Sequence, residues 1–368
     1  MSSSEDSPKQ GKGFFTVALS LIDDMVQLGA SADELAAYLV LARGAGKKTY
    51  TSWAANAVAN YTGLTYYRAN ESISWLVEHS FISKPIFSTD DKSKKTKLKW
   101  QFKQAADDIE VVLANVLVDG MGAGANNPPL ARIHNQITMG KHGLGAARLD
   151  TLMVLLHLYK HQLLADYGGI NPQAGIYKHW QTAENSYGDK VADLAGTVDA
   201  ALYEIKGGAD SVYKQFAKES LFYVPDADER HQRFWAAFNN LKQLGWLYET
   251  TQIWSADPSK HKRAEPLYTL YVHDRHARDS DPYLANAINQ VAIKQVNPDY
   301  GFFNQDGEFD PEADLFGGQF RYVANKKTGG FPIGIYRLKF RPHTKDTGKG
   351  MAAESQRVKG WEQALHAL

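Results

Sequence analysis

The chain has 368 residues, 43% of them hydrophobic, and its 41 lysines and arginines balance 41 aspartates and glutamates. This length and composition predict a globular protein of two or three domains. A net charge of zero excludes a chain that is basic along its whole length, so any affinity for nucleic acid must come from local patches.

Cysteine is absent, which excludes disulfides and thiolate metal sites and agrees with a reducing cytosol. We find no apolar run of about 18 residues and no basic leader followed by an apolar stretch. No membrane span and no signal peptide are therefore expected, and the expected location is the cytoplasm.

The N-terminal part of the chain predicts a tail followed by two elements. Residues 1–13 are rich in Ser, Lys and Gly and are expected to be disordered. Residues 15–28 are apolar and predict a first helix, or a strand followed by a helix. Ser31 and Glu34 have the spacing of a capping box, and apolar residues continue at helical spacing to Ala42.

Residues 51–80 predict two helices joined by a tight turn. Thr51 or Ser52 can cap a helix over residues 53–61, and Gly63 can end it in the left-handed conformation. The next helix begins near Thr65. Its apolar residues predict a buried stripe of Ala69, Ile73, Leu76 and Val77. Five other side chains are expected to point away from that stripe: Thr65, Tyr67, Arg68, Glu71 and Ser72.

A hairpin is expected after these helices. Phe81 and Ile82 open a strand, Asp90 and Asp91 sit in a turn, and a lysine-dense arm precedes Trp100 and Phe102. The lysines of that arm are Lys92, Lys94, Lys95, Lys97 and Lys99. Two helices and a basic hairpin fit the groove and the phosphates of a duplex. The alternatives are a solvated hairpin, an ion pair of Arg68 with Glu71 or another acid, and packing of Tyr66, Tyr67 and Trp75.

The middle of the chain predicts helices and a linker. Residues 105–118 have amphipathic helical spacing, and residues 120–145 are rich in Gly, Asn and Pro and predict a linker. An apolar helix runs from residue 148 to Leu163, and Gly168 and Gly169 end it. Further helices are expected at 190–204, 211–219 and 228–244.

An internal repeat links this region to the first helices. Leu76, Ser80, Phe81 and Ile82 lie three, seven, eight and nine residues after Ile73, and Leu241, Gly245, Trp246 and Leu247 lie at the same distances after Phe238. The second copy predicts strands at 247–254 and 266–272. The turn between these strands carries Lys260, His261, Lys262 and Arg263, and the helix before them carries Arg230 and Arg233.

Both copies resemble the winged helix-turn-helix superfamily of prokaryotic DNA-binding proteins. The first copy carries the pattern of that superfamily at Gly63, Leu64, Ala69, Ile73, Leu76, Ser80, Phe81 and Ile82, with serine in place of the usual glycine at position 80. The resemblance covers about fifty residues of the first copy and about forty-five of the second, where residues 181–223 form an insertion. Tandem winged helices also resemble plasmid and phage replication initiators.

The C-terminal region is less informative. Residues 282–296 predict a helix and residues 300–340 a small β-rich region, and residues 348–368 are expected to end in a short helix that contains Trp361 and Leu365. A basic string runs through Arg337, Lys339, Arg341, His343, Lys345 and Lys349. It fits a strand edge protected by charge as well as an arm that contacts phosphates.

No catalytic or metal motif stands out. The acidic residues at 306–314 lack the glycine and the final glutamate of a calcium loop. His157 and His161 lie four residues apart, but on an apolar helix, where a position on the helix surface or in the core is the better interpretation. The sequence contains no phosphate-binding loop motif. We therefore expect a protein that is not an enzyme, without cofactor or metal.

The sequence as a whole predicts a mainly α fold with small β wings. It comprises a tail (1–13), winged helix-turn-helix module 1 (14–104), a helix and linker (105–147), winged helix-turn-helix module 2 with its insertion (148–275) and a mixed α/β region (276–368). The predicted function is sequence-specific binding of double-stranded DNA by a transcriptional regulator of bacterial, phage or plasmid origin. A replication initiator and a winged-helix protein adaptor are the alternatives, and a homodimer is left open. The candidate DNA-binding residues are Thr65, Tyr66, Tyr67, Arg68, Ser72, Lys92, Lys94, Lys95, Lys97, Lys99, Arg230, Arg233, Lys260, Lys262 and Arg263.

Overall fold

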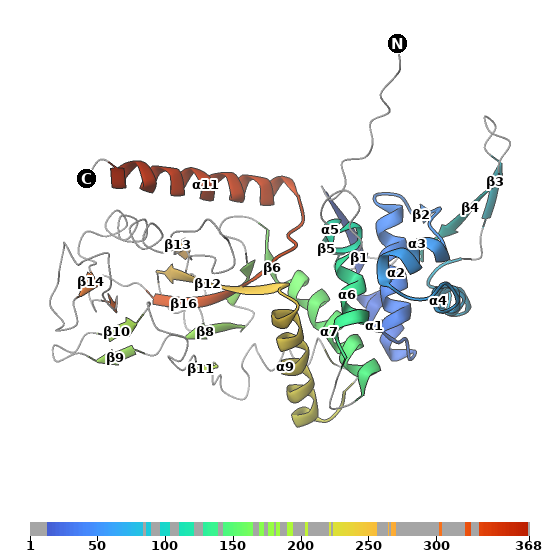
Figure 1. Cartoon of the computed structure of the whole chain (residues 1–368), viewed down its shortest axis with the longest axis horizontal. Coiled ribbons are helices and arrows are strands. Elements are labelled where there is room, and N and C mark those ends of the chain that lie inside the picture. The colour runs from blue at the N-terminus through green and yellow to red at the C-terminus, as the bar shows by residue number, and fades with distance from the viewer. Residues whose placement is uncertain are drawn as a thin grey trace, which may run out of the picture. The chain divides into compact units, whose positions relative to one another are not determined.

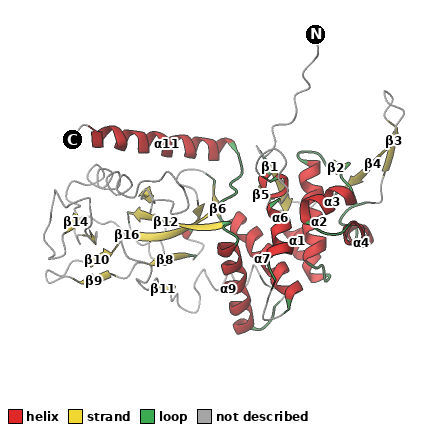
Figure 2. Cartoon of the chain, in the orientation of Figure 1, coloured by secondary structure: helices red, strands yellow, loops and turns green. Residues whose placement is uncertain are grey.

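The structure of the chain is a computed structural model (Figure 1). It describes residues 13–83, 86–89, 96–103, 110–120, 128–138, 143–164, 169–172, 176–179, 182–184, 190–193, 203–204, 221, 224–255, 264, 266–269, 302–303, 321–324 and 331–366. The described part is mainly helical and carries small antiparallel sheets, as the sequence predicts (Figure 2). No helix in it is both long and apolar enough to cross a membrane.

The chain divides into two units, each assembled from segments that are distant in the sequence. Unit 1 comprises Met1–His161, Phe216–Leu247 and Leu338–Lys345, and unit 2 comprises the remaining segments Gln162–Gln215, Tyr248–Arg337 and Asp346–Leu368. This division differs from the consecutive domains that the sequence predicts. The difference arises because α7 (Leu144–Lys160) and α9 (Ala227–Gln243) pack on each other, and α7 also packs on α2 (Ala32–Ala45).

Unit 1 begins with a strand and a helix. β1 (Phe14–Ala18) leads directly into α1 (Leu19–Gln27), which confirms the second of the two interpretations of residues 15–28. β1 pairs antiparallel with β5 (Glu110–Ala114). The helix predicted over residues 105–118 is therefore wrong, because residues 110–114 pair with a distant strand. The short α5 (Val116–Asp119) follows β5.

Three helices and a three-stranded sheet follow. α2 begins after Ser31 with the predicted capping box, and nearly all of it is buried. The elements after it are β2 (Tyr50–Thr51), α3 (Ala55–Thr62), α4 (Tyr66–Glu78), β3 (Ile86–Thr89) and β4 (Thr96–Gln101). The strands lie in the order β2-β4-β3, with β4 antiparallel to both neighbours, so the predicted hairpin is confirmed. Figure 1 shows β3 and β4 extending away from the helices of unit 1.

α3 starts later than the sequence predicts, at Ala55. Thr51 lies buried in β2 instead of capping the helix, and its Oγ1 accepts a hydrogen bond from the Trp53 amide at 3.1 Å. Gly63 ends α3 with φ 73°, the left-handed conformation that the sequence predicts. The turn between α3 and α4 is therefore fixed by its glycine.

The region predicted to be a linker contains a helix. α6 (Pro129–Gln136) begins with a proline in its first turn and buries Leu130 and Ile133. α7 runs from Leu144 to Lys160, so it ends before the glycines predicted to stop it. α9 starts after Asp226, whose side chain accepts from the Glu229 amide, close to the predicted start at residue 228.

The repeated sequence pattern has the same backbone geometry in both copies. Ser80 after α4 and Gly245 after α9 have φ 63° and 68°. The next residue in each copy, Phe81 or Trp246, is buried and donates its amide proton to the leucine carbonyl of the preceding helix, both at 2.9 Å. The carbonyl of that same residue accepts from Lys103 at 3.0 Å in the first copy and from Lys339 at 2.8 Å in the second. Ser80 thus takes the conformation for which glycine is more usual.

The described residues of unit 2 form strands and one long helix. A five-stranded sheet has the order β11-β8-β16-β12-β13, a four-stranded sheet the order β14-β15-β10-β9, and β6 pairs with β7. The bounds are β6 (Gln162–Leu163), β7 (Gly169–Ile170), β8 (Tyr177–His179), β9 (Thr182–Glu184), β10 (Lys190–Asp193), β11 (Tyr203–Glu204), β12 (Leu247–Trp254), β13 (Pro266–Thr269), β14 (Phe302–Phe303), β15 (Arg321–Ala324), β16 (Phe331–Leu338) and α11 (Lys345–His366).

These elements confirm some of the predictions and correct others. β12 and β13 pair antiparallel, as predicted for the second copy, and residues 300–340 contribute strands where they are described. The helix predicted at 190–204 is wrong, because Lys190–Asp193 is a strand that pairs on both sides. α11 is longer than the predicted final helix. The segments 211–219, 282–296 and 306–314 lie outside the described residues.

Candidate nucleic-acid interface

α4 is fixed by an apolar stripe and by its N-terminal cap. Of the four predicted stripe residues, Ala69, Ile73 and Leu76 are at most 4% exposed, whereas Val77 is only partly buried. α4 packs on both α2 and α3. Thr65 Oγ1 accepts from the Arg68 amide at 3.3 Å, as the predicted helix start requires. The orientation of α4 is therefore set on its buried side.

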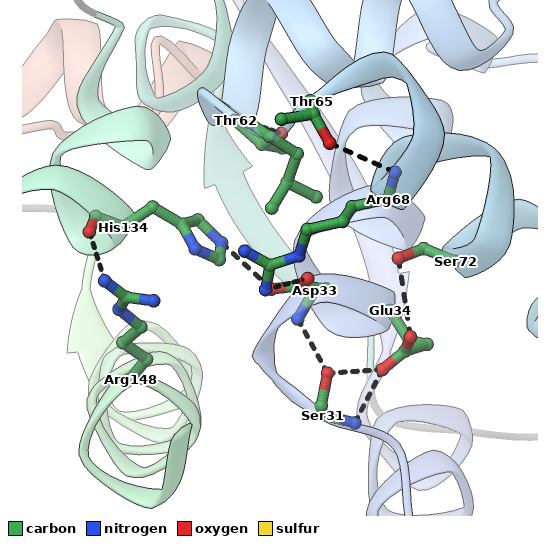
Figure 3. Close-up of polar contacts among 10 residues, drawn as sticks. Ser31, Asp33, Glu34, Thr62, Thr65, Arg68, Ser72, His134 and Arg148 are labelled. Atoms are coloured by element: carbon green, nitrogen blue, oxygen red, sulfur yellow. Dashed lines mark hydrogen bonds and ion pairs between the residues drawn. The ribbon is translucent and has the colours of Figure 1, made fainter. Parts of the chain in front are cut away.

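Two polar contacts add to this packing, and we call their four residues (Asp33, Glu34, Arg68 and Ser72) the α2–α4 clamp (Figure 3). The Arg68 guanidinium forms an ion pair with the Asp33 carboxylate. Ser72 Oγ donates to Glu34 Oε1 at 3.4 Å, while Glu34 Oε2 accepts from the Ser31 amide at 2.7 Å. Arg68 and Ser72 lie one turn apart, so the clamp fixes the rotation of α4 about its own axis.

Ser72 corrects one prediction. The sequence places it on the outward face of α4, but it is 1% exposed and faces Glu34. The buried hydroxyl is stable there because it has a carboxylate partner. Ser72 is therefore removed from the candidate contacts. Arg68 forms an ion pair, which the sequence left open as the alternative to base reading. Its acidic partner is Asp33, not Glu71.

The clamp lies next to a histidine and a second arginine (Figure 3). His134 Nε2 lies 3.6 Å from Asp33 Oδ1, and Arg148 donates to the His134 carbonyl. Burial raises the pKa of Asp33, and the neighbouring Arg68 partly offsets that rise. Burial, followed by the charges of Arg148 and Arg68, lowers the pKa of His134 to about 4, so this imidazole is neutral at neutral pH.

The outer surface of α4 carries aromatic and polar side chains. Tyr66 and Tyr67 are 59% and 70% exposed, so the interpretation that they pack in the core is wrong. Asn70, Glu71 and Ser74 are also exposed. A hydrogen bond from Tyr67 to Glu71 raises the pKa of the tyrosine. Trp75, in contrast, stacks on Phe81 and His79, as expected for a packing residue.

Two lysines lie beside Tyr50 of the β2-β4-β3 sheet. The Nζ atoms of Lys48 and Lys99 lie 5.5 Å and 4.9 Å from the ring centroid of Tyr50. Lys99 and Lys97 both belong to β4. The predicted contacts Lys92, Lys94 and Lys95 lie outside the described residues. Two ammonium groups, one of them from the hairpin, thus meet at one tyrosine.

In the second copy, the described candidates Arg230 and Arg233 make contacts within unit 1. Arg233 forms a two-point ion pair with Asp150, at 2.8 Å and 2.7 Å, and only 12% of its side chain is exposed. Arg230 donates to the Val224 carbonyl at 2.9 Å. Lys260, Lys262 and Arg263 lie outside the described residues. Arg230 and Arg233 therefore hold α9 in place, and we do not include them in the interface.

Arg68 and Arg233 occupy the same place in the repeat, five residues before Ile73 and Phe238. Each pairs with an aspartate of the helix on which its own helix packs, Asp33 of α2 or Asp150 of α7. A second contact accompanies each pair: Ser72 with Glu34 in the first copy, and Asn240 with Thr151 at 3.1 Å in the second. Sequence reasoning missed both aspartates, since neither is close in sequence to its arginine.

Neither a metal site among the described residues nor a similarity to known proteins adds to the description of this interface. Among the described residues, no group of three or more His, Asp or Glu side chains could hold a metal ion. Of the two positions that the sequence leaves open for His157, surface and core, the structure shows the core, with Nε2 3.8 Å from Asp23 Oδ1. No protein-family model, no curated protein and no solved structure matches the chain.

Proposed function

We propose that residues 31–103 form a winged helix-turn-helix and that this module binds double-stranded DNA in a sequence-specific manner, as part of a transcriptional regulator. The order of elements supports the assignment: helix α2, strand β2, helices α3 and α4, then the β3–β4 hairpin. The sheet order β2-β4-β3 places the hairpin beside the first strand. In such modules the last helix enters the major groove.

The observation that carries the proposal is the exposed outer face of α4. Its buried face is held by apolar packing and by the α2–α4 clamp, while Tyr66, Tyr67 and Asn70 are exposed. An α-helix fits the major groove of B-DNA, where its side chains reach the base edges. A rigid helix with an exposed polar and aromatic face is suited to that position.

Phosphate contacts come from the hairpin in this proposal. The charged residues of α4 are Arg68, Glu71 and Glu78, so its net charge is negative and does not attract DNA. Lys48 and Lys99 beside Tyr50, together with the other lysines of the hairpin, supply positive charge outside α4. Phosphate contacts position a protein on DNA, and base contacts specify the sequence.

The repeated geometry favours a second candidate function, a replication initiator. Unit 1 contains two copies of the same helix end, buried aromatic residue and arginine–aspartate pair. Two winged helices in one chain suit binding to repeated sites. If both copies contact one duplex, half-sites about 10 bp apart would lie on the same face.

The experiment is selection of bound fragments from a random duplex library, followed by titration of the selected and scrambled duplexes at several salt concentrations. We expect a preferred sequence and an affinity that falls steeply with salt. Binding without salt dependence, or no binding, would contradict the proposal and favour the alternative of a winged-helix adaptor that binds a protein. Local melting of the bound duplex, or recruitment of a helicase to it, would identify the initiator.

A further inference from the structure

We infer that Asn70 reads a base from α4, that this base is adenine, and that Arg68 is a positioning residue of the helix. The inference rests on the DNA-binding function proposed above and names the residue that gives it specificity. It reverses the expectation from the sequence, in which Arg68 is the base-reading residue.

Arg68 is held by the body of the module. Its guanidinium is paired with Asp33 at the start of α2, and that carboxylate is only 12% exposed. The equivalent Arg233 pairs with Asp150 in the second copy, where the aspartate is 5% exposed and the arginine 12%. The second pair is buried too deeply to meet a ligand. The same pairing in both copies indicates that the arginine at this place holds a helix to its neighbour.

Asn70 lies on the outer side of α4. Tyr67, Asn70 and Ser74 follow one another at spacings of three and four residues and form one exposed stripe. The neighbours of Asn70 on this face are occupied: Tyr67 bonds to Glu71, and Ser74 Oγ donates to the Asn70 carbonyl at 2.9 Å. Within the part of the chain that the structure describes, the side-chain amide of Asn70 has no hydrogen-bond partner.

The chemistry of the amide selects the base. An asparagine side chain offers one acceptor oxygen and an NH₂ donor. Adenine presents an N6 donor and an N7 acceptor side by side in the major groove, which match that pair, whereas guanine presents two acceptors there. A guanidinium would select guanine, so the two assignments predict different bases. The Asn70 amide makes α4 an adenine reader.

The test repeats the fragment selection with the full-length chain and with Asn70→Ala, Arg68→Ala and Asn56→Ala. Asn56 is an exposed asparagine of α3 and serves as the matched control. We expect the wild-type site to contain an adenine whose preference disappears in Asn70→Ala alone. Affinity for the selected duplex should fall roughly 10-fold, and affinity for a scrambled duplex should not change. For Arg68→Ala, we expect affinity for the selected duplex to fall while the adenine preference remains, because the ion pair that holds α4 is lost.

The outcomes separate this inference from the proposed function. A wild-type protein that prefers a sequence, with a preference unchanged in Asn70→Ala, would overturn the assignment of Asn70 and leave DNA binding intact. Loss of a guanine preference in Arg68→Ala would return base reading to Arg68. A wild-type protein that binds no duplex would overturn both proposals. Thermal melting of each variant checks that Asn70→Ala is folded, as expected for an exposed side chain.

Discussion

Arg68 and Arg233 hold the same place in a repeated structural pattern, and each forms an ion pair with the helix on which its own helix packs. The two pairs differ in exposure. The side chain of Arg68 is 50% exposed, and that of Arg233 is 12% exposed. Solvent screens the first pair more than the second, so equal substitutions should have unequal effects.

Arg233→Ala should lower the free energy of unfolding by about 3 kcal/mol, because it removes the two-point ion pair that compensates the buried Asp150 carboxylate. The measurement is chemical denaturation. Joint replacement of Asp150 by Leu and Arg233 by Met should recover most of the loss, since well-packed apolar side chains can replace a buried pair. Arg230→Ala, which removes one bond to a carbonyl, is the control and should cost about 1 kcal/mol. A loss of similar size in both variants would contradict this account.

Arg68→Ala should cost less stability, about 1 kcal/mol, because the Arg68 side chain of the pair is half-exposed and screened by solvent. Arg68→Lys should recover part of that loss by retaining the positive charge. Denaturation of the two variants beside Arg233→Ala gives the comparison. If Arg68→Ala were as destabilising as Arg233→Ala, exposure would not explain the difference between the two copies.

Stability should fall as the pH drops through the range set by His134. Its pKa is lowered from 6.5 to about 4 in the folded protein. As the pH falls, the unfolded chain therefore binds a proton at His134 before the folded protein does. The free energy of unfolding should drop by up to about 3 kcal/mol between pH 6.5 and 4. The raised pKa of Asp33 acts in the opposite direction at the acid end, because the folded protein then takes up that proton more readily.

Denaturation across this pH range checks the prediction, with His134→Asn as the test. The asparagine does not titrate, so the variant should depend less on pH in this window. His343→Asn changes an exposed histidine and is the matched control. An unchanged pH profile in His134→Asn would show that His134 is not the titrating group.

Replacing Lys94, Lys95 and Lys97 by alanine should weaken binding to all duplexes alike. Removal of each lysine–phosphate interaction should flatten the slope of log affinity against log salt by about one. The matched control replaces Lys345, Lys349 and Lys359, which are exposed lysines of α11. A change of slope only in the control would assign the phosphate contacts to the C-terminal region.

Gly44→Ala should destabilise unit 1 by about 1–3 kcal/mol through overpacking. An added Cβ at this position of α2 would lie 2.5 Å from Trp53 Cδ2 and 2.6 Å from Thr51 Oγ1. Gly145→Ala is the matched control, because no atom lies within 4 Å of a Cβ built there, in the first turn of α7. It should stabilise the chain by about 0.5 kcal/mol. Melting temperatures that move in the same direction would contradict the prediction.

Local chemistry made much of unit 1 predictable from the sequence. The capping box of Ser31, the left-handed Gly63 and the stripe Ala69, Ile73 and Leu76 each depend on residues within one or two helical turns. The repeat after Ile73 and Phe238 was also visible, because its buried residues recur at fixed distances. Such signals specify a helix and its buried face without knowledge of its partner.

Errors arose where a residue depends on a distant partner. Residues 110–114 have spacing that fits a helix, yet they form a strand because they pair with β1, which lies far earlier in the chain. Ser72 turns inward toward Glu34, which is 38 residues away. The role of Arg68 also depends on Asp33, which helical periodicity alone cannot identify. At the candidate site, the orientation of Ser72 and the role of Arg68 therefore depend on side-chain contacts between α4 and α2, which the sequence pattern of α4 does not reveal.

The interleaved construction of unit 1 has a consequence for how the chain is synthesised. Trp246 accepts a hydrogen bond from the Lys339 amide and packs edge-on against Phe340, while Tyr159 donates to the Phe340 carbonyl. These contacts cannot form on the ribosome until residue 340 has emerged from the exit tunnel. A nascent chain that already contains α2, α4, α7 and α9 still exposes the apolar surface around Trp246. Translation through residue 340 thus precedes completion of unit 1.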